Sequence, residues 1–466
     1  MSKLTASLEE AIIASGLKDG MCISFHHHLR NGDYVLNKVM DAIAKLGIGT
    51  LTINASSIFD SHAPLLTHIK NGVVTGLETN YMGPLVGKAV SEGILQQPVL
   101  FRTHGGRPSD IETGKSPIDV AFIAAPTADN QGNCTGQFGK SACGSLGYAF
   151  PDAMYAKQVV VITDNLVEYP LADYSISEVY VDQVVVVDAI GDPQGIVSGT
   201  TRMTRDPIAL RIADLTATVI SASGLLKAGF SFQTGAGGAP LAVGQRVQEL
   251  MLQKGIKGSF ALGGTTGYLV NMLDAGCFES ILDVQCFDLK AVESLRRNPR
   301  HVEISASHYA SPLAKSCVAD NLDVVVLGAT QIDVNFNVNV HTDSNGHIIG
   351  GSGGHSDVAA GAKLALVIAP LNRARLSIVV DQVLTTSTPG STVDALVTQY
   401  GVAVNPRRED LQRTLGASGL PLVAIEKLRA MAEEINGVPQ KPTPKDRVVG
   451  NVMYRDGTII DEILQI

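Results

Sequence analysis

The residues best suited to chemistry lie in a glycine-rich loop, Gly350-Gly351-Ser352-Gly353-Gly354-His355-Ser356-Asp357. Glycines permit positive φ angles and let backbone N–H groups approach a ligand closely. A helix is expected at 358–363, and its start adds unpaired N–H donors and a favourable dipole. Such a loop can bind a phosphate or hold a developing oxyanion. A tight structural turn, with Asp357 as a helix cap, is the alternative interpretation.

A second glycine-rich segment, Gly235-Ala236-Gly237-Gly238-Ala239-Pro240, also precedes an apolar, helix-like stretch. Its N–H groups are therefore placed to face an anion in the same way. Glycine turns before helices are common, so this segment alone is weak evidence for a site. A third glycine cluster, at 263–267, follows a predicted strand at 260–262.

Three adjacent histidines, His26, His27 and His28, follow a predicted strand end at 23–25 and come just before Arg30. Consecutive residues of an extended chain alternate faces, and no His-x-x-x-His or acidic pattern lies nearby, so we predict no metal site here. We expect His26, His27 and Arg30 to bind an anion through hydrogen bonds. A purely structural strand end is the alternative.

Arg107 ends the segment His104-Gly105-Gly106-Arg107, which combines a flexible turn with a guanidinium. A guanidinium binds a carboxylate through two parallel hydrogen bonds, so Arg107 is a candidate carboxylate ligand. A surface turn with a solvated arginine is the alternative. The sequence contains no Walker A loop or strand-anchored GxGxxG motif, and therefore gives no sign of a nucleotide site of those kinds.

The strands that position these loops are predicted from short, β-branched apolar runs without period-two alternation, which is typical of strands covered by helices on both faces. These runs lie at 51–53, 120–123, 159–163, 184–187, 324–327, 366–368, 378–380 and 422–425. Helix-like stretches lie between them, for example at 35–45, 208–217, 243–254, 291–298 and 425–435. The alternation of strands and helices predicts an α/β fold.

The chain also shows an internal duplication. The segment 118–122 resembles 322–326 at an offset of 204 residues, and Asn133 and Asn337 keep that offset. Glycine-rich stretches at 144–147 and 351–354 follow, and then Asp152 and Lys157 match Asp357 and Lys363. An ordered series at a nearly constant offset indicates two related open α/β-sheet domains in tandem, at 1–205 and 206–466.

Length and composition exclude some classes of function. A chain of 466 residues favours two domains. A net charge of −9 without a dense basic block argues against nucleic acid and acidic membranes as partners. We see no signal-peptide pattern at the N-terminus and no apolar run of ~20 residues. The six cysteines form no CxxC pairs, so the sequence suggests neither a zinc site nor a disulfide framework. Free cysteines are typical of a reducing compartment, and we therefore expect a cytoplasmic enzyme.

Longer segments resemble the CoA-transferase superfamily and, within it, the citrate lyase alpha-chain family. The likeness runs from about Leu8 to the C-terminus and includes 24–27 with Arg30 and Asp33, then 61–65, 104–107, 118–122, 142–149, 201–204, 336–340 and 353–355. In the superfamily a Gly-x-Gly-Gly-x-x-Asp loop helps to bind the thioester, and 351–357 fits that spacing. The resemblance thus implies two CoA-transferase-like domains.

The sequence departs from the superfamily at one informative place. Members that form a glutamyl thioester carry a glutamate in the stretch that matches 262–267, which here reads Leu-Gly-Gly-Thr-Thr-Gly. The resemblance therefore implies exchange of acetyl for citryl on a thioester through a mixed anhydride, without a covalent enzyme intermediate. We assign Gly237, Gly238, Gly351, Ser352, Gly353 and Gly354 to the thioester. We expect Gly353 and Gly354 to stabilise the oxyanion, and our hypothesis is that His26, His27, Arg30 and Arg107 hold citrate.

The resemblance also implies the partners. No cofactor of its own is expected, because acetyl-CoA or the phosphopantetheine-type arm of an acyl carrier protein is the substrate. Citrate, a carrier-protein (gamma) subunit and a lyase (beta) subunit are the expected partners, in an oligomer. Two alternatives stay open. One is a CoA-transferase or thioester hydrolase for another dicarboxylate or tricarboxylate, such as citramalate; the other is a non-catalytic subunit that docks a carrier protein.

Overall fold

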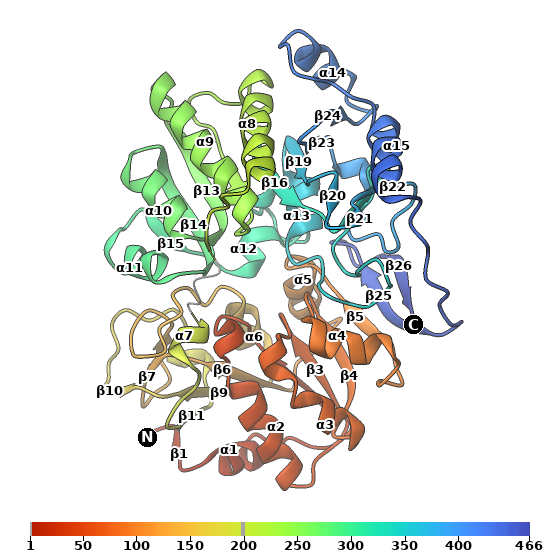
Figure 1. Ribbon diagram of the computed structural model, residues 1–466. Coiled ribbons are helices and arrows are strands. Elements are labelled where there is room, and N and C mark those ends of the chain that lie inside the picture. The colour runs from red at the N-terminus through yellow and green to blue at the C-terminus, as the bar shows by residue number, and fades with distance from the viewer. Residues whose placement is uncertain (1, 197–200) are drawn as a thin grey trace.

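Two mainly parallel β-sheets, one in each lobe, organise the chain (Figure 1). The computed structural model describes residues 2–196 and 201–466. The first sheet has the strand order β1 (Leu4–Thr5), β11 (Gln183–Val186), β9 (Gln158–Thr163), β6 (Val120–Ala124), β2 (Cys22–Phe25), β3 (Leu51–Ala55), β4 (Val74–Thr79), β5 (Val99–Phe101), β25 (Val448–Met453) and β26 (Ile459–Leu464).

The second sheet lies in the second lobe. Its order is β15 (His301–Glu303), β14 (Phe278–Cys286), β13 (Gly258–Thr265), β12 (Phe232–Thr234), β16 (Val324–Gly328), β19 (Leu364–Ile368), β23 (Ala395–Thr398) and β24 (Gly401–Val404). All neighbouring strands in it are parallel except β23 and β24. A parallel sheet needs crossover helices on its faces, as the alternation of elements in the sequence predicts.

The two sheets share one topology, which confirms the predicted pair of related open-sheet domains. Reading from one edge, β11-β9-β6-β2-β3-β4-β5 in the first sheet corresponds to β23-β19-β16-β12-β13-β14-β15 in the second. Side-chain contacts repeat as well. Lys157 pairs with Asp119 at 2.7 Å, and Lys363 pairs with Asp323 at 2.8 Å. The sequence offset therefore reflects a duplicated structural unit.

Helices cover both sheets. In the first lobe they are α1 (Leu8–Ala14), α2 (Val35–Lys45), α3 (Leu65–Lys70), α4 (Pro84–Ser91), α5 (Gly106–Glu112), α6 (Ala149–Tyr155) and α7 (Pro193–Ile196). In the second they are α8 (Pro207–Ala222), α9 (Gly238–Lys254), α10 (Gly267–Asp274), α11 (Leu289–Arg297), α12 (Ala306–Ala310), α13 (His355–Gly361), α14 (Glu409–Gly416) and α15 (Ile425–Asn436). No helix of the described residues is long and apolar enough to cross a bilayer.

Local chemistry explains where the second lobe's first helix begins. Asp206 caps α8 by accepting hydrogen bonds from the N–H groups of Ile208 and Ala209, and Pro207 occupies the first helical position. Proline suits that position because its missing N–H would have no partner in the helix. The start of α8 thus coincides with the proposed boundary between 205 and 206.

Strand burial explains why the apolar runs lack alternation. In β16, Val324 and Val326 pack into the core on one face of the sheet, whereas Val325 and Leu327 pack into the core on the other face. All four side chains are buried. Because helices cover both faces, every position of such a strand must be apolar.

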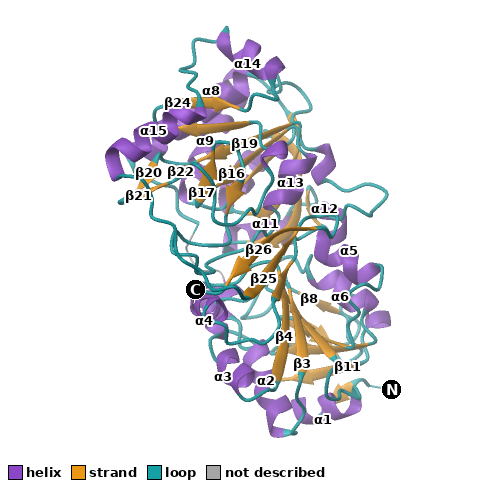
Figure 2. Cartoon of the chain, turned by 90° about the vertical axis from the view of Figure 1, so that its right-hand side faces the viewer, coloured by secondary structure: helices purple, strands orange, loops and turns teal. Residues whose placement is uncertain are grey.

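The C-terminal hairpin returns to the first lobe. Strand β25 pairs in parallel with β5, and β26 pairs antiparallel with β25, so the last strands of the chain extend the first sheet (Figures 1 and 2). The sequence predicts a second domain over residues 206–466. Residues 448–464 instead complete the first sheet, because its edge strand β5 offers unpaired backbone groups to any strand that reaches it.

The remaining strands are short and lie beside the main sheets. They are β7 (Thr127–Asp129), β8 (Cys134–Thr135), β10 (Leu166–Val167), β17 (Gln331–Asp333), β18 (Val338–Asn339), β20 (Asn372–Arg373), β21 (Leu376–Ser377) and β22 (Val379–Val380). The predicted strand at 422–425 is wrong. Leu422 forms only a single bridge with Val402, and α15 already begins at Ile425.

Candidate active site

A cavity of about 400 Å³ lies between the lobes, where strands of both sheets reach their carboxyl ends. Its volume suits a small-molecule site, and open α/β sheets place ligands at this edge. The groups on its wall that could contact a substrate are His27, Arg30, His104, Tyr148, Gln285, Tyr309, Gly353, Gly354 and His355. Both halves of the duplicated fold therefore build one site.

The glycine loop, residues 350–357, is attached to the end of the first sheet by backbone hydrogen bonds. The Gly353 N–H donates to the Asn80 carbonyl at 3.1 Å, and the Gly353 carbonyl accepts from the His104 N–H at 2.8 Å. Asp357 reinforces the junction, because its carboxylate accepts from the Gly105 N–H at 2.9 Å and the Thr103 hydroxyl at 2.7 Å. The loop is thus held between the two lobes.

Glycine is required at both cavity positions of this loop. Gly353 has a φ of +52°, a left-handed conformation that strains other residues. At Gly354 a Cβ atom would lie 2.3 Å from the Tyr309 hydroxyl oxygen. Of the predicted loop residues, Gly353 and Gly354 line the cavity. Gly351 and Ser352 lie outside its wall: Gly351 packs against the Asn80 carbonyl, and Ser352 contacts Ser356.

The two predicted oxyanion donors differ in availability. The Gly353 N–H already donates to Asn80, so it does not point an unused proton at the cavity. The Gly354 N–H has no hydrogen-bond acceptor among the described residues. The geometry therefore favours Gly354 over Gly353 as the backbone donor and gives Gly353 the task of shaping the loop.

The second glycine loop lines an adjoining cavity of about 370 Å³. Gly237 and Gly238 form part of its wall, together with Arg373. Gly235 and Gly328 belong to the walls of both cavities, so the two cavities are neighbours. Helix α9 begins at Gly238, with Gly237 as its N-cap, so the start of this helix forms part of the cavity wall.

His26 and His28 form a buried hydrogen-bond chain and do not line the cavity. The Ala124 N–H donates to His26 Nε2 at 3.0 Å, so His26 carries its proton on Nδ1 and donates to His28 Nδ1 at 2.8 Å. His28 then donates through Nε2 to the Val284 carbonyl at 3.3 Å in the other lobe. Burial lowers the pKa of His26 to about 4 and that of His28 well below its ordinary value. The structure therefore gives His26 a structural role.

His27 lines the cavity, but both of its ring nitrogens have partners. The Gln285 amide N–H donates to the His27 carbonyl at 3.2 Å, which fixes the Gln285 carbonyl oxygen as the acceptor for His27 Nε2 at 3.1 Å. His27 Nδ1 then accepts from the Ser56 hydroxyl at 2.6 Å. Burial holds the pKa of His27 well below its ordinary value. His27 is thus a neutral residue that links the lobes at the cavity wall.

Arg30 supplies a cation to the cavity wall. Its guanidinium carbon lies 4.7 Å from the centroid of the Phe287 ring, and one nitrogen donates to the Phe287 carbonyl at 3.3 Å. Burial lowers its pKa from the ordinary arginine value, and Asp288 acts in the opposite direction. A guanidinium stays protonated across the physiological range, so Arg30 is suited to an anionic substrate.

Arg107 does not reach the cavity, and its expected role as a citrate ligand is corrected. Its side chain is buried, and two of its nitrogens donate to the Asp152 carboxylate at 2.8 and 2.9 Å. The same side chain donates to Asn54 at 2.6 and 3.1 Å. Arg107 therefore binds a carboxylate, as predicted, but this carboxylate is the side chain of Asp152 and not a substrate. The two residues meet because α5, which carries Arg107, packs against α6, which carries Asp152.

Sequence reasoning missed His104. It lies directly beside Gly353 in the cavity wall, and its ring stacks on His27 with centroids 5.4 Å apart. Burial lowers the pKa of His104 to about 3, and the Arg107 charge acts in the same direction. The only signal in the sequence was its place in the His104-Gly105-Gly106-Arg107 segment. In that segment Arg107, and not His104, was predicted to bind the substrate.

The wall of the cavity carries no aspartate, glutamate or cysteine among the described residues. At Gly264, within the stretch where the superfamily glutamate is expected, a Cβ atom would lie 1.8 Å from the Phe287 ring. A glutamate could not occupy this position without displacement of Phe287. Among the described residues of the wall, no side chain could therefore accept the acyl group in the manner of a glutamyl thioester.

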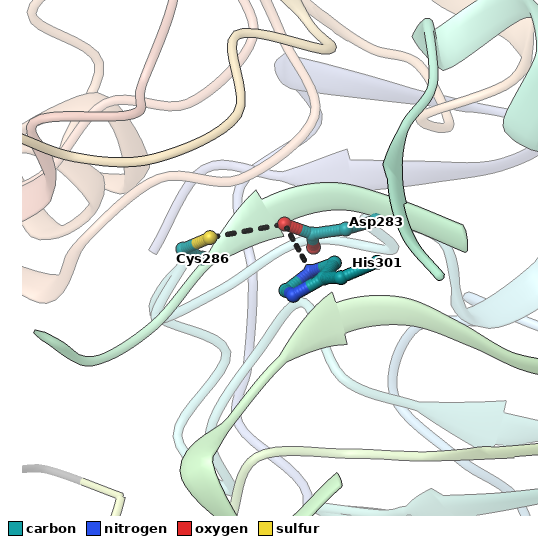
Figure 3. A group of neighbouring side chains, drawn as sticks. All are labelled: Asp283, Cys286 and His301. Carbon is teal, nitrogen blue, oxygen red and sulfur yellow. Dashed lines mark hydrogen bonds and ion pairs between the residues drawn. The ribbon is translucent and has the colours of Figure 1, made fainter. Parts of the chain in front are cut away.

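One buried group has the atoms of a metal site. Asp283, Cys286 and His301 place a carboxylate oxygen, Sγ and a ring nitrogen within 4.8 Å of one another (Figure 3). Asp283 already accepts from Thr265 and Ser145 at 2.7 Å and from Cys286 at 3.0 Å. Burial and the Asp283 charge raise the pKa of Cys286 well above its ordinary value, which opposes the thiolate that a metal requires. The absence of a metal stays a prediction.

This architecture defines a protein of the CoA-transferase class: paired open α/β sheets that enclose one site between a glycine loop and the facing strand ends. The family model "Citrate lyase, alpha subunit" matches residues 1–466. The chain therefore belongs to the citrate lyase alpha-subunit family, the CoA-transferase component of citrate lyase, as the sequence predicted.

Relatives support the assignment. The chain is 49% identical over 464 residues to the citrate lyase alpha chains of Haemophilus influenzae and Escherichia coli, covering all of this chain and 93% and 91% of those proteins. The crystal structure of the alpha subunit of citrate lyase from Streptococcus mutans, in complex with citrate, matches with a TM-score of 0.99 and 50% identity, covering 100% of this chain and 92% of that one. A malonate decarboxylase alpha subunit from Acinetobacter baumannii, 17% identical, shares the fold with a TM-score of 0.68 over 94% of this chain and 90% of its own.

Proposed function

We propose that this enzyme exchanges acetyl for citryl on the thioester of an acyl carrier protein or CoA, with citrate itself as the nucleophile. A citrate carboxylate attacks the acetyl thioester carbonyl, and the tetrahedral oxyanion collapses to a mixed anhydride and a thiolate. The thiolate then attacks the citryl carbonyl and expels acetate. No step requires an enzyme nucleophile, so positioning of the two reactants supplies a large part of the acceleration.

The observation that carries this proposal is the chemical make-up of the cavity wall. It has a backbone donor at Gly354 and a cation at Arg30, but no aspartate, glutamate or cysteine among the described residues. An anionic substrate can enter such a site, and preplaced N–H donors can stabilise the oxyanion that both steps develop. A wall with this composition suits transfer between two bound substrates better than a covalent relay through the protein.

Citrate is assigned to the side of the cavity formed by Arg30 and His27. The structural relative from Streptococcus mutans binds citrate, and it is 50% identical to this chain over its full length. Arg30 provides the charge that a tricarboxylate needs. His27 and Gln285, which bond to each other across the lobes at 3.1 Å, can exchange that bond for a citrate oxygen. Arg107 is left out, because its donors are used by Asp152 and Asn54.

The thioester arm is assigned to the glycine loops. We assign Gly353 and Gly354, which line the first cavity, to the reacting carbonyl, and Gly237 and Gly238, which line the adjoining cavity, to the phosphopantetheine-type arm. The arm would pass the shared wall at Gly235 and Gly328 to bring its sulfur to the first cavity. Acetyl-CoA can substitute for the carrier protein because both present the same arm. The enzyme then needs no bound cofactor of its own.

The partners follow from this reaction. A carrier-protein (gamma) subunit must deliver the acetyl thioester, and a lyase (beta) subunit must cleave the citryl thioester, in an oligomeric complex. We place that complex in the cytoplasm, where a reducing medium maintains the six cysteines as the free thiols found here.

Incubation of the purified chain with acetyl-CoA and citrate tests the proposal, with mass spectrometry of the thioester products. Formation of citryl-CoA and acetate is the expected result, and the acetyl carrier protein should give the same exchange. Release of free CoA and acetate without citryl thioester would identify a hydrolase. Faster turnover with citramalate than with citrate would identify citramalate as the preferred substrate. No turnover with either thioester would indicate a non-catalytic subunit that docks a carrier protein.

A further inference from the structure

The hydrogen bonds around His104 determine which of its nitrogens carries the proton. The Asn80 side-chain amide nitrogen lies 3.0 Å from the Thr103 carbonyl oxygen and must therefore be the NH₂ group. The same nitrogen lies 2.9 Å from His104 Nδ1, so Nδ1 is the acceptor. A neutral imidazole has one donor and one acceptor, which places the proton of His104 on Nε2.

That Nε2–H group lies beside the glycine loop. A Cβ atom built on Gly353 would be 3.3 Å from His104 Nε2, and both residues line the cavity. The ring is held in this position by three contacts. Its backbone N–H bonds to the Gly353 carbonyl at 2.8 Å, and its ring packs 5.4 Å from His27 and 4.4 Å from Tyr148. The donor is thus fixed in direction before any substrate binds.

The backbone of the glycine loop offers only one of the two hydrogen-bond donors that an oxyanion hole needs. Oxyanion holes generally use two or more N–H or O–H groups, but the Gly353 N–H bonds to the Asn80 carbonyl. Asn80 therefore has two effects: its carbonyl takes the Gly353 proton, and its side chain directs the proton of His104 toward the cavity. The Gly354 N–H then needs a second donor beside it.

We propose that His104 Nε2–H is the side-chain donor that, with the Gly354 N–H, stabilises the tetrahedral oxyanion of the acyl transfer. This inference rests on the proposed function. When the carboxylate oxygen bonds to the thioester carbon, the carbonyl π electrons move to oxygen, and that oxygen accepts the hydrogen bond from His104. Collapse restores the carbonyl and expels the thiolate. His104 keeps its proton throughout and serves both attacks.

The kinetic test compares two substitutions of His104. His104→Phe keeps a ring to pack against His27 and Tyr148 but removes the donor, whereas His104→Gln retains an N–H at a similar reach. The loss of one oxyanion donor costs about 100- to 1,000-fold in kcat in other enzymes, so His104→Phe should lose that much, with the KM for citrate within about threefold of wild type. His104→Gln should recover at least tenfold of that loss.

His341 provides a matched control. It is also a buried histidine whose pKa is lowered to about 3, and it packs edge-on against Phe101 at 5.1 Å, outside the cavity wall. His341→Phe should change thermal stability but leave kcat per folded molecule near the wild-type value. A wild-type kcat in His104→Phe, or a kcat in His104→Gln as low as that of His104→Phe, would overturn the inference.

A tautomer measurement keeps the inference testable if His104→Phe fails to fold. Long-range ¹H–¹⁵N NMR of the ¹⁵N-histidine-labelled wild-type chain should show His104 protonated on Nε2 and bare on Nδ1, with the signal identified by its absence in His104→Gln. Protonation on Nδ1 would overturn the inference. Absence of citryl thioester formation by the wild type would instead contradict the proposed function, while leaving the tautomer measurable.

Discussion

The Gly353 carbonyl oxygen accepts a hydrogen bond from the His104 N–H at 2.8 Å, and this contact joins the second lobe's glycine loop to the strand end of the first lobe. The Asn80 carbonyl accepts from the Gly353 N–H at 3.1 Å and completes the junction. Two residues some 250 positions apart in sequence thus form adjacent parts of one cavity wall. The site exists only when both duplicated units are folded and docked.

Arg30→Gln should weaken citrate binding more than it slows transfer. Hydrogen bonds to a charged group contribute about 1.5–3 kcal/mol, which corresponds to roughly a 10- to 100-fold higher KM for citrate. Steady-state kinetics with citrate as the varied substrate measures this effect. Arg246→Gln, on the exposed face of α9, is the control and should leave the citrate KM unchanged. An unchanged KM in Arg30→Gln would remove Arg30 from the citrate site.

Arg107→Ala should lower the stability of the fold and leave the KM for citrate unchanged. The substitution leaves the buried Asp152 carboxylate without its partner, and breaking a buried pair in this way costs about 3–5 kcal/mol. Urea denaturation measures the loss, and kinetics at low temperature gives the citrate KM of the folded fraction. A raised citrate KM together with wild-type stability would restore the original assignment of Arg107 to the substrate.

Gly354→Ala should abolish most activity through sterics. The added Cβ would lie 2.3 Å from the Tyr309 hydroxyl, so either the loop or the tyrosine must move. Displacement of the Gly354 N–H removes an oxyanion donor, and we expect kcat to fall by about 100-fold or more. Gly416→Ala, where a Cβ would meet nothing within 4 Å, is the control and should be fully active. Wild-type kcat in Gly354→Ala would exclude this glycine from catalysis.

Stability should fall as the pH drops from about 6.5 toward 4. Burial depresses the pKa of His26 and His355 to about 4 and that of His104 and His341 to about 3, so the unfolded chain takes up protons that the folded chain resists. Each such histidine contributes stability that is present above pH 6.5 and is lost as the pH falls through its folded-state pKa, about 2–3 kcal/mol of it between pH 7 and pH 4.5.

Carboxyls whose pKa is raised by burial, Glu303, Asp357 and Asp394, act in the opposite direction. Burial raises the pKa of Glu303 to about 7 and that of Asp357 to about 6, and their stabilising contribution is present at low pH and lost as the pH rises. The histidines outnumber them, so the net slope should follow the histidines. Urea unfolding at pH 7 and pH 4.5 tests the sign, and equal or greater stability at pH 4.5 would contradict this account of the buried rings.

The fold could be predicted from local patterns because they are repeated. Apolar runs in parallel strands and the offset of 204 residues were sufficient to predict two related open sheets. The strand wrongly predicted at 422–425 shows the limit of such patterns. A short apolar run next to a helix start has too little periodicity to distinguish a strand from a helix. The return of β25 to the first sheet depends on a distant edge strand, which no local pattern encodes.

The site was predictable only where backbone geometry defines it. Gly353 and Gly354 were predicted because a Gly-x-Gly-Gly spacing needs no partner to be recognised, and both line the cavity. Arg107 was misplaced because its partner, Asp152, is 45 residues away and becomes visible only when α5 and α6 pack. His104 was not predicted because the Asn80 side chain that determines its tautomer is 24 residues away, and this contact forms only in the folded chain.

The central claim is that the acyl group passes directly between substrates, and oxygen transfer tests it most directly. A single turnover would use enzyme in excess over acetyl thioester and citrate labelled with ¹⁸O in its carboxylates, with mass spectrometry of the acetate released. Direct attack makes a citrate oxygen the bridge of the mixed anhydride, so each acetate should carry one ¹⁸O. Unlabelled acetate, with the label retained on a carboxylate of the protein, would show an acylated enzyme and contradict the account.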